Sequence, residues 1–481
     1  MAIRFDQISL LTDFYEFTMA YTYFKENKHE QIAYFDMFVR NIPDNGGFLI
    51  FNGLNRLIDV IQNFKFTKKD IDFLRNSYNF DEDFLEYLLN MKLTIDIWSV
   101  EEGTPVFANE PLVTVRGTAV QAQIIETLLL ICINYPTLVT TKAARIVYSA
   151  KGRAVMEFGA RRAQGIDASL EGARNAVIAG CIGTSNSLAG LNYSIPVSGT
   201  IAHSYIQLHD TEYDAFLSYC KVNPKNSVLL VDTYDTLKSG VVNAIKVAQN
   251  WLIPNGYKLN AIRLDSGDLA YLSKKARIML DEAGLQSTKI IASNSLDEYI
   301  IDDLILQDAK IDIFAVGENL VTSKSNPVLG GVYKVVAYEK NEEIIPVIKI
   351  SDNITKITNP GLKSLIRFYD IETNKAIADL ICLADEVIPL DTYTLFDPDY
   401  PWKKKTITNY TFKHLQVPVF VNGQLVYHRR TTMETRAYCS TQMDTLWDEV
   451  KRLRNPHNYY VDLSDKLWNL KRELIDKNKK V

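Results

Sequence analysis

Val228-Leu-Leu-Val-Asp232 begins a stretch, extending to Asn319, in which one pattern occurs four times. Each occurrence has a short aliphatic run, then an abrupt polar cluster, then a segment with helical periodicity. The other three runs are Ala261-Ile-Arg-Leu-Asp265, Lys289-Ile-Ile-Ala-Ser-Asn294 and Ile311-Asp-Ile-Phe-Ala-Val-Gly317. Short β-branched runs bounded by polar breakers are typical of parallel strands, because such strands are covered on both faces. The pattern therefore predicts a parallel sheet whose strands alternate with helices.

Helices are predicted between these runs, and further strands before them. Apolar residues recur at steps of three and four over 236–252, 268–283 and 296–309, which predicts amphipathic crossover helices. Upstream, residues 154–162 and 196–204 are predicted as strands that end in polar groups. This part of the chain then holds about seven strands, a series that predicts a complete or incomplete α/β barrel.

The flanking regions have a different pattern. Residues 32–115 mix strand-like and helix-like segments, which predicts a separate α+β domain. After Gly330-Gly331, alternating segments over 332–382 joined by short turns predict an antiparallel meander, and helices follow it. We therefore expect an N-terminal α+β domain at 1–130, an α/β barrel with the active site at 131–330, and an antiparallel segment with C-terminal helices at 331–481.

Composition narrows the class of protein. The 481 residues are 47% hydrophobic and 23% charged, as in ordinary globular proteins. A net charge of −5 disfavours nucleic-acid binding. No uninterrupted apolar run reaches the roughly 18 residues that cross a bilayer, and the first residues lack a signal-peptide core, so we expect a cytoplasmic protein without membrane contact. The five scattered cysteines have no CxxC spacing and indicate neither disulfides nor a zinc site.

Several residues could carry chemistry, and each has a plainer alternative. Asp265-Ser-Gly-Asp268 combines carboxylates, a hydroxyl and a glycine where a helix begins, yet it could simply cap that helix. Arg161 and Arg162 could form structural ion pairs or a fork for an anion. His203 has no partner at metal-ligand spacing, which leaves a core histidine, acid/base work or nucleophilic catalysis. Tyr15 lies off the apolar stripe of its helix, so it faces a ligand, another subunit or solvent.

Five motifs in this order closely resemble nicotinate phosphoribosyltransferase: Asp13-Phe-Tyr-Glu-Phe-Thr-Met19, Glu157-Phe-Gly-Ala-Arg-Arg162, Gly199-Thr-Ile-Ala-His-Ser204, Arg263-Leu-Asp-Ser-Gly-Asp268, and Asn455-Pro-His457 with Val461-Asp-Leu463. The resemblance implies a homodimer of two-lobed subunits, in which an irregular, incomplete barrel joins an α+β domain built from both ends of the chain. It implies condensation of nicotinate with phosphoribosyl pyrophosphate to nicotinate mononucleotide and pyrophosphate. In that family ATP hydrolysis is coupled through a phosphohistidine, and Mg²⁺ is expected on the pyrophosphate or ATP.

The resemblance also implies roles for individual residues. His203 would be the phosphohistidine. Phe158, together with Tyr15 of a second subunit, would sandwich the pyridine ring. The residues that would hold or orient nicotinate are Arg263, Arg161 and Thr200. Those that match ribose- and phosphate-binding positions are Asp265, Ser266, Gly267, Asp268, Ser293, Asn294 and Gly317, and Thr358, in a cation-rich turn at 356–363, would close on the phosphates.

Some residues distinguish this function from alternative functions. Glu318 beside Gly317 departs from the family pattern and puts the contacts of that loop in doubt. Nicotinamide phosphoribosyltransferase has an acid where Ser185 stands, so Ser185 favours the acid substrate over the amide. An aldolase would need a lysine at a strand end, and none of the predicted strands ends in one. A non-catalytic binding protein would be expected to have lost His203 or the 263–268 cluster.

Overall fold

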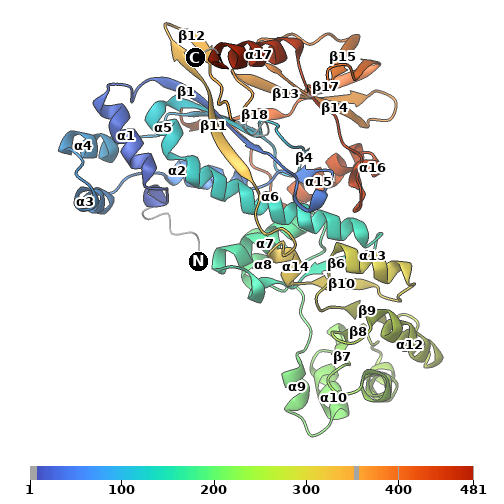
Figure 1. The fold of residues 1–481 in the computed structure, drawn as a ribbon. Helices are drawn as coiled ribbons and strands as arrows, with labels where there is room; N and C mark the ends of the chain where they lie inside the picture. Colours follow the sequence, from blue (N-terminus) through green and yellow to red (C-terminus); the bar gives the residue numbers. More distant parts are fainter. Residues whose placement is uncertain (1–7, 352–356, 399, 480–481) are drawn as a thin grey trace. The chain divides into compact units, whose positions relative to one another are not determined.

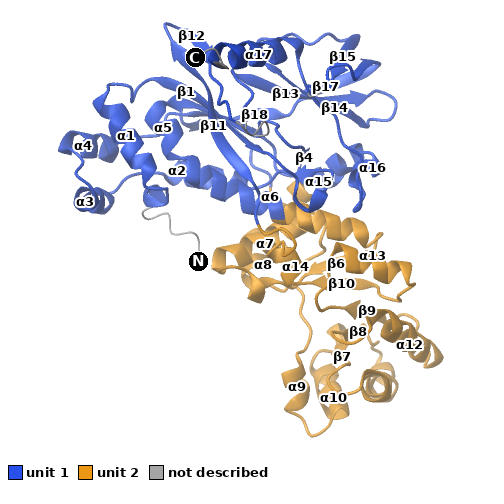
Figure 2. Ribbon diagram, viewed as in Figure 1, with its two compact units in different colours: residues 1–138, 328–430, 437–481 blue, residues 139–327, 431–436 orange. Residues whose placement is uncertain are grey.

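The computed structural model describes residues 8–351, 357–398 and 400–479, which form two compact units (Figures 1 and 2). Unit 1 comprises residues 1–138, 328–430 and 437–481, and unit 2 comprises residues 139–327 and 431–436. The chain thus leaves unit 1 after residue 138 and re-enters it at 328, where the sequence had suggested 130 and 331. Unit 1 is therefore assembled from distant parts of the sequence.

A seven-stranded antiparallel sheet forms the centre of unit 1. In spatial order its strands are β12 (Glu343–Pro346), β11 (Gly331–Lys340), β1 (Ile32–Val39), β5 (Val113–Thr118), β3 (Asp96–Val100), β18 (Gln416–Val421) and β19 (Gln424–Leu425). Strand β1, in the interior of this sheet, pairs with β5 on one side and with β11 on the other, with Met37 opposite Tyr333. Segments from both ends of the chain therefore share one sheet.

The remaining strands of unit 1 form smaller sheets. The four-stranded sheet contains β17 (Tyr410–His414), β13 (Lys363–Asp370), β14 (Ala376–Leu383) and β20 (Val461–Leu463), and the two pairs are β15 (Thr392–Phe396) with β16 (Lys404–Thr408) and β2 (Leu49–Ile50) with β4 (Pro105–Val106). The predicted single meander over 332–382 is therefore wrong, because β11–β12 and β13–β14 are hairpins in two different sheets. Alternating hydrophobicity specifies which face of a strand is buried, but not which strand it pairs with.

Helices cover the sheets of unit 1. They are α1 (Tyr15–Lys25), α2 (Leu54–Asn63), α3 (Lys68–Ser77), α4 (Glu82–Asn90), α5 (Ala119–Ile124), α16 (Asp448–Lys451), α17 (Asp465–Lys479), and parts of α6 (Glu126–Ser149) and α15 (Thr432–Thr445). Leu57, Leu88 and Ile124 from three of these helices are fully buried in one core with strand residues. The helical stretch Ala119–Ser149 is long and apolar enough to cross a membrane, yet 72% of its most apolar window is buried in protein. That burial is typical of a core helix.

Unit 2 contains the predicted parallel sheet, in the order β6 (Ala154–Glu157), β10 (Ile313–Val316), β9 (Lys289–Ala292), β8 (Ala261–Leu264) and β7 (Val228–Leu230). Parallel bridges from Glu157 to Thr184 and from Thr184 to Val197 extend the ladder beyond β6. Among the described residues no pairing joins Val197 to β7 at the opposite edge. The sheet is therefore an open, incomplete barrel, and the predicted fold class is confirmed.

The helices of unit 2 are α7 (Ile166–Ile178), α8 (Ser187–Tyr193), α9 (His203–Gln207), α10 (Glu212–Val222), α11 (Val241–Val247), α12 (Leu269–Glu282), α13 (Glu298–Leu306) and α14 (Glu318–Val321). π-Helical segments at Thr236–Gly240 and Ala248–Leu252 flank α11. The strand predicted over 196–204 is wrong: only Val197 is bridged, and His203 begins α9. Pro196 lacks the N–H that a ladder needs, and the adjoining residues through Gly199 are exposed.

Candidate active site

Arg263 on β8 gathers predicted site residues from three segments of unit 2. Its Nε donates to Ser293 Oγ, its Nη1 to Thr200 Oγ1 and its Nη2 to Asp265 Oδ1, each at 2.9 Å. Ser293 Oγ also donates to Asp265 Oδ1. Because parallel strands end at one edge, the residues following β8 and β9 meet there, as expected for a site of an α/β fold.

Phe158 lies on another side of the same guanidinium. Arg263 Cζ is 5.8 Å from the centroid of the Phe158 ring, within the range of a cation–π contact. The loop after β6 approaches the end of β10 closely, since the Phe158 N–H donates to Val316 O at 2.7 Å. A Cβ on Gly159 would lie 2.7 Å from Gly317 O, so only glycine fits there. This close approach brings Phe158 and Gly317 together.

His203 contacts residues that follow two neighbouring strands, β7 and β8. Its Nδ1 is 3.1 Å from Thr233 Oγ1, beyond the end of β7, and its Nε2 is 3.8 Å from Asp265 Oδ2. The imidazole is 41% exposed and therefore accessible to a ligand. It is not a core histidine, although it reaches this position from a helix start instead of the predicted strand end.

Asp232 holds the turn that follows β8, and the sequence pattern had not singled it out. Its Oδ2 accepts from the Asp265 N–H at 3.0 Å and from Ser266 Oγ at 2.5 Å. Gly267 turns the chain with a φ of +77°, a conformation that favours glycine. Asp268 then caps α12 by accepting from the Tyr271 N–H at 2.9 Å, which is the plainer alternative for that residue. The position of Asp232 at the end of the first aliphatic run was the signal that could have revealed it.

Glu157 is a second residue that sequence reasoning did not select. It is fully buried at the end of β6. One carboxylate oxygen accepts from Thr184 Oγ1 at 2.5 Å and the other from the Gly159 N–H. Burial raises the pKa of this carboxyl above its ordinary value. Glu157 therefore holds the loop that contains Phe158, because it accepts a hydrogen bond from the Gly159 N–H.

Other predicted residues of unit 2 lie nearby in sequence but are less constrained. Arg161 is exposed on a short 3-10 helix after Phe158, and no polar contact within the described part of the chain joins it to Arg263. Asn294 is also exposed. The unusual Glu318 pairs with Lys324 at 2.7 Å, and that cation holds the pKa of the acid below its ordinary value. Its charge is thus locally compensated.

Tyr15 and Thr358 belong to unit 1. Tyr15 is the first residue of α1 and is 46% exposed, and burial of its hydroxyl end raises its pKa. Thr358 is buried, and its Oγ1 accepts from the Lys349 N–H at 3.3 Å. Lys356, at the start of the same turn, lies outside the described residues. The roles expected of these residues toward the substrates remain predictions.

Two further observations concern ligands. Within the described ranges no group of three or more His, Cys, Asp or Glu side chains is placed to hold a metal ion. A cavity of about 660 Å³ lies in unit 1 between Lys405, Trp447 and Tyr460, and none of the predicted site residues lines it. The predicted site residues that contact one another are those at the strand ends of unit 2.

Comparison with known proteins identifies the family. Models of the nicotinate phosphoribosyltransferase (NAPRTase) N-terminal domain, family and C-terminal domain match residues 10–134, 153–376 and 362–471. Nicotinate phosphoribosyltransferase of Bacillus subtilis is 43% identical over 473 residues, covering 98% of this chain and 96% of that protein. The Homo sapiens enzyme is 29% identical, covering 96% and 95%. The crystal structure of human nicotinic acid phosphoribosyltransferase matches with a TM-score of 0.85 at 27% identity, covering 96% of this chain and 99% of that one. This chain therefore belongs to the nicotinate phosphoribosyltransferase family, the transferases of NAD biosynthesis.

Proposed function

We propose that this enzyme condenses nicotinate with phosphoribosyl pyrophosphate and couples the reaction to ATP hydrolysis through phosphorylation of His203. Family membership supports the two substrates. The observation that carries the proposal is the convergence of Arg263, Asp265 and an accessible His203 at one edge of the parallel sheet. Binding, charge stabilisation and phosphoryl acceptance need these three kinds of group within reach of each other.

Nicotinate would bind through its ring and its carboxylate. Phe158 offers a ring face for the pyridine, and Arg263 supplies positive charge 5.8 Å from the centroid of the Phe158 ring. A guanidinium favours a carboxylate over a neutral amide, because charge-assisted hydrogen bonds are the stronger ones. Glu157, the nearby buried acid, already accepts from Thr184 and Gly159, which disfavours its use as an acceptor for an amide NH₂. These contacts support nicotinate over the alternative substrate nicotinamide.

In the transfer step the ring nitrogen of nicotinate forms a bond to C1′ of the ribose as the bond from C1′ to pyrophosphate breaks. The leaving pyrophosphate takes the electron pair, so positive charge develops on the sugar. Asp265 would stabilise that charge, while Ser266, Gly267, Asp268, Ser293, Asn294 and Gly317 would hold the ribose and phosphates. Positioning and electrostatics carry most of such a reaction.

His203 would act as the phosphoryl acceptor. If Nδ1–H donates to Thr233, Nε2 keeps a lone pair that attacks the γ-phosphorus of ATP, and ADP leaves. The phosphoryl group adds about −1.5 to −2 charges at an atom 3.8 Å from Asp265 Oδ2. Repulsion between the two would reorganise the contacts of Arg263 before substrate turnover. Water later removes the phosphoryl group as inorganic phosphate.

Magnesium ion is a proposed cofactor, and the residues present suit it. Asp232 Oδ1 is buried without a hydrogen-bond partner among the described residues, and Asp265, which follows the neighbouring strand β8, donates its N–H to Asp232 Oδ2 at 3.0 Å. Mg²⁺ is commonly held by one or two carboxylates together with substrate phosphates. Asp232 and Asp265 would hold the ion, which would neutralise charge on the pyrophosphate.

A cytoplasmic homodimer is proposed. The homodimer is supported by Tyr15, which is half-exposed on α1 and which the family resemblance assigns to the ring site of a second subunit. In this proposal Tyr15 of one subunit completes the ring site of the other. Mixing Tyr15→Ala and His203→Ala proteins, neither of which should have ATP-coupled activity alone, should then restore part of that activity through hybrid dimers. Failure to recover activity after verified subunit exchange would contradict the shared site.

The function is tested by assaying products with nicotinate, nicotinamide and quinolinate side by side, each with and without ATP. We expect mononucleotide from nicotinate, faster at limiting phosphoribosyl pyrophosphate when ATP is present. Faster turnover of nicotinamide would favour the alternative phosphoribosyltransferase. Absence of product from all three substrates would favour a non-catalytic barrel protein.

A further inference from the structure

The loop between β9 and α13 has an unusual backbone beside the active site. Ser293 contacts Arg263 and Asp265, whereas the next two residues are exposed. Asn294 has a φ of +86° and Ser295 a φ of +51°, so two successive residues other than glycine are left-handed. Such a conformation persists only where surrounding contacts enforce it, and it is concentrated at ligand-binding positions.

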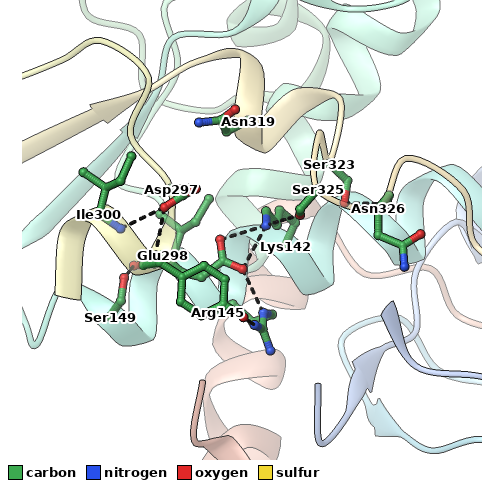
Figure 3. A network of polar contacts seen from close by, with 12 residues as sticks. Lys142, Arg145, Ser149, Asp297, Glu298, Ile300, Asn319, Ser323, Ser325 and Asn326 are labelled. Atoms are coloured by element: carbon green, nitrogen blue, oxygen red, sulfur yellow. Dashed lines mark hydrogen bonds and ion pairs between the residues drawn. The ribbon is translucent and has the colours of Figure 1, made fainter. Parts of the chain in front are cut away.

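One anchor of this loop is a buried cluster of charges at the start of α13. Glu298 accepts from Lys142 Nζ at 2.8 Å and from Arg145 Nε at 3.0 Å (Figure 3). The three side chains are 0%, 2% and 4% exposed, respectively. Arg145 Nη2 also donates to Tyr299 OH at 3.0 Å, and Lys142 Nζ to Ser325 Oγ at 2.7 Å. Helix α6 thereby fixes both the first turn of α13 and the segment after α14.

A second anchor holds the middle of the loop. Asn319 on α14 donates through Nδ2 to Ser295 O at 2.9 Å and to Leu296 O at 3.1 Å. Asp297 then caps α13 by accepting from the Tyr299 and Ile300 N–H groups at 3.0 and 2.8 Å. The two left-handed residues therefore lie between Ser293 in the site and a segment that is held through the Ser295 and Leu296 carbonyls and the Asp297 and Glu298 side chains.

Stability alone does not account for the buried cluster. Replacing a buried ion pair by apolar residues of similar volume is often neutral or stabilising, because desolvation offsets the attraction between charges. Hydrogen bonds are directional, whereas apolar contacts are not. Two cations that donate to one carboxylate therefore fix the position of Glu298 and of the first turn of α13, which carries it. The cluster is thus suited to positioning.

We propose that Glu298, held by Lys142 and Arg145, and Asn319 are positioning residues that set the 293–297 loop for binding the phosphorylated substrate. This inference rests on the proposed function. Asn294 and Ser295 would be the exposed polar groups offered to phosphoribosyl pyrophosphate. Arg263 is also held by Thr200 and Asp265, so the nicotinate end of the site depends less on this loop.

The test compares Glu298→Gln and Asn319→Ala with the double variant. Displacing a binding group by about 1 Å can cost up to about 100-fold, so we expect KM for phosphoribosyl pyrophosphate to rise about tenfold in each single variant. KM for nicotinate should change less than threefold, roughly, since its contacts have other supports. The double variant should show less than the product of the two increases, because both act on one loop.

Asp308→Asn is the matched control. It removes one carboxylate from an exposed ion pair with Lys310 in the same unit, and asparagine tolerates the φ of +58° at that position. It should leave both KM values unchanged. Thermal unfolding of each variant separates loss of folded protein from loss of affinity, and Asn319→Ala removes only a partly exposed side chain if Glu298→Gln proves unstable.

Two results would overturn the inference. If wild-type turnover is normal and KM for phosphoribosyl pyrophosphate stays within about twofold in folded Asn319→Ala and Glu298→Gln proteins, these residues are structural only. If the wild-type chain neither turns over the two substrates nor binds phosphoribosyl pyrophosphate by calorimetry, the proposed function itself fails, and the loop assignment fails with it.

Discussion

Arg263 in unit 2 and Arg367 in unit 1 show how the same chemical group serves two purposes. Arg367 is fully buried, pairs with Asp379 at 2.7 and 2.5 Å, and lies against the rings of Phe107 and Tyr459. Arg263 is 16% exposed, and its donors go to a hydroxyl from each of two segments and to one carboxylate. The first arginine is enclosed by protein groups, whereas the second remains within reach of a ligand.

The acids around the two arginines differ in the same way. Glu110 is fully buried beside Asp379, and burial together with the charge of Asp379 raises its pKa well above the ordinary value. Asp265, by contrast, is partly exposed beside Arg263 and His203. Accessibility at a strand end, rather than charge, separates the candidate site from a structural ion pair.

His203→Ala is expected to have the largest effect. Removing the only proposed phosphoryl acceptor should abolish substrate-dependent ATP hydrolysis, while slow synthesis of the mononucleotide without ATP continues. The two rates are measured in the same reaction by phosphate release and product formation. His209→Ala is the control, because that histidine contacts the Tyr205 carbonyl in the same unit and has no proposed role. ATP hydrolysis that persists in step with product would return His203 to a structural role.

Arg367→Met should act on stability and not on chemistry. It leaves Asp379 buried without its cation, which costs about 3 to 5 kcal/mol of unfolding free energy. Urea unfolding measures the loss, and the protein that remains folded should keep its KM values. Adding Asp379→Leu should recover much of the stability, because no buried charge is then left alone. If Arg367→Met instead lost affinity for nicotinate selectively, Arg367 would have a role in substrate binding and would not be a purely structural arginine.

Arg263→Ala should show the opposite pattern. Each charge-assisted hydrogen bond is worth about 1.5 to 3 kcal/mol, so kcat/KM for nicotinate should fall about 10- to 150-fold while the unfolding free energy changes less than in Arg367→Met. KM for phosphoribosyl pyrophosphate should rise less than KM for nicotinate. Steady-state kinetics with each substrate varied in turn provides the measurement. Equal effects on both substrates would remove Arg263 from carboxylate recognition.

Glu16 offers the smallest effect, through pH. It is fully buried on α1, and burial raises its pKa from 4.5 to about 7. The folded state thus binds a proton more tightly than the unfolded state, so stability falls as pH rises from about 4.5 to about 7 and stays reduced above that. Glu16→Gln should be more stable than wild type by about 1 to 3 kcal/mol at pH 8, and should show no advantage at pH 4.5.

The pH prediction is checked by urea unfolding at both pH values. Glu26→Gln is the control, since Glu26 is exposed just beyond the end of the same helix. A difference that does not depend on pH would mean that Glu16 remains ionised in the folded protein.

Local patterns predicted the candidate site better than distant ones did. The run ending in Asp265 predicted both β8 and the polar turn, because strand length, burial and the helix start are set by neighbouring residues. His203 was expected at a strand end, but residues 196–202 lack the continuous apolar run of a buried strand, and Pro196 has no N–H to donate to a ladder. The contact of Asp232 with the Asp265 turn depends on the pairing of β7 with β8, and the contact of Thr233 with His203 depends on tertiary packing, so the sequence alone predicted neither contact.

The sequence did not predict which strands pair when they lie far apart along the chain. The strand containing Arg367 has the apolar pattern of a buried strand, but its pairing with Asp379 depends on the register of one hairpin. Likewise, nothing in β1 identifies β11 as its neighbour, because both show only which residues are apolar. Loop strain at Asn294 and Ser295 also arises from tertiary contacts, which a single sequence does not display.

The pairing of β1 with β11 has a consequence for protein synthesis. Roughly 290 residues separate the two strands, and at about 5 to 20 residues per second a ribosome takes about 15 to 60 s to cover that distance. During this time one edge of β1, a strand rich in aromatic and aliphatic residues, has exposed N–H and C=O groups. Unpaired edges of this kind promote aggregation. We expect nascent chains that stall before β11 to require chaperones, whereas residues 139–327 emerge as one continuous segment that can fold while synthesis continues.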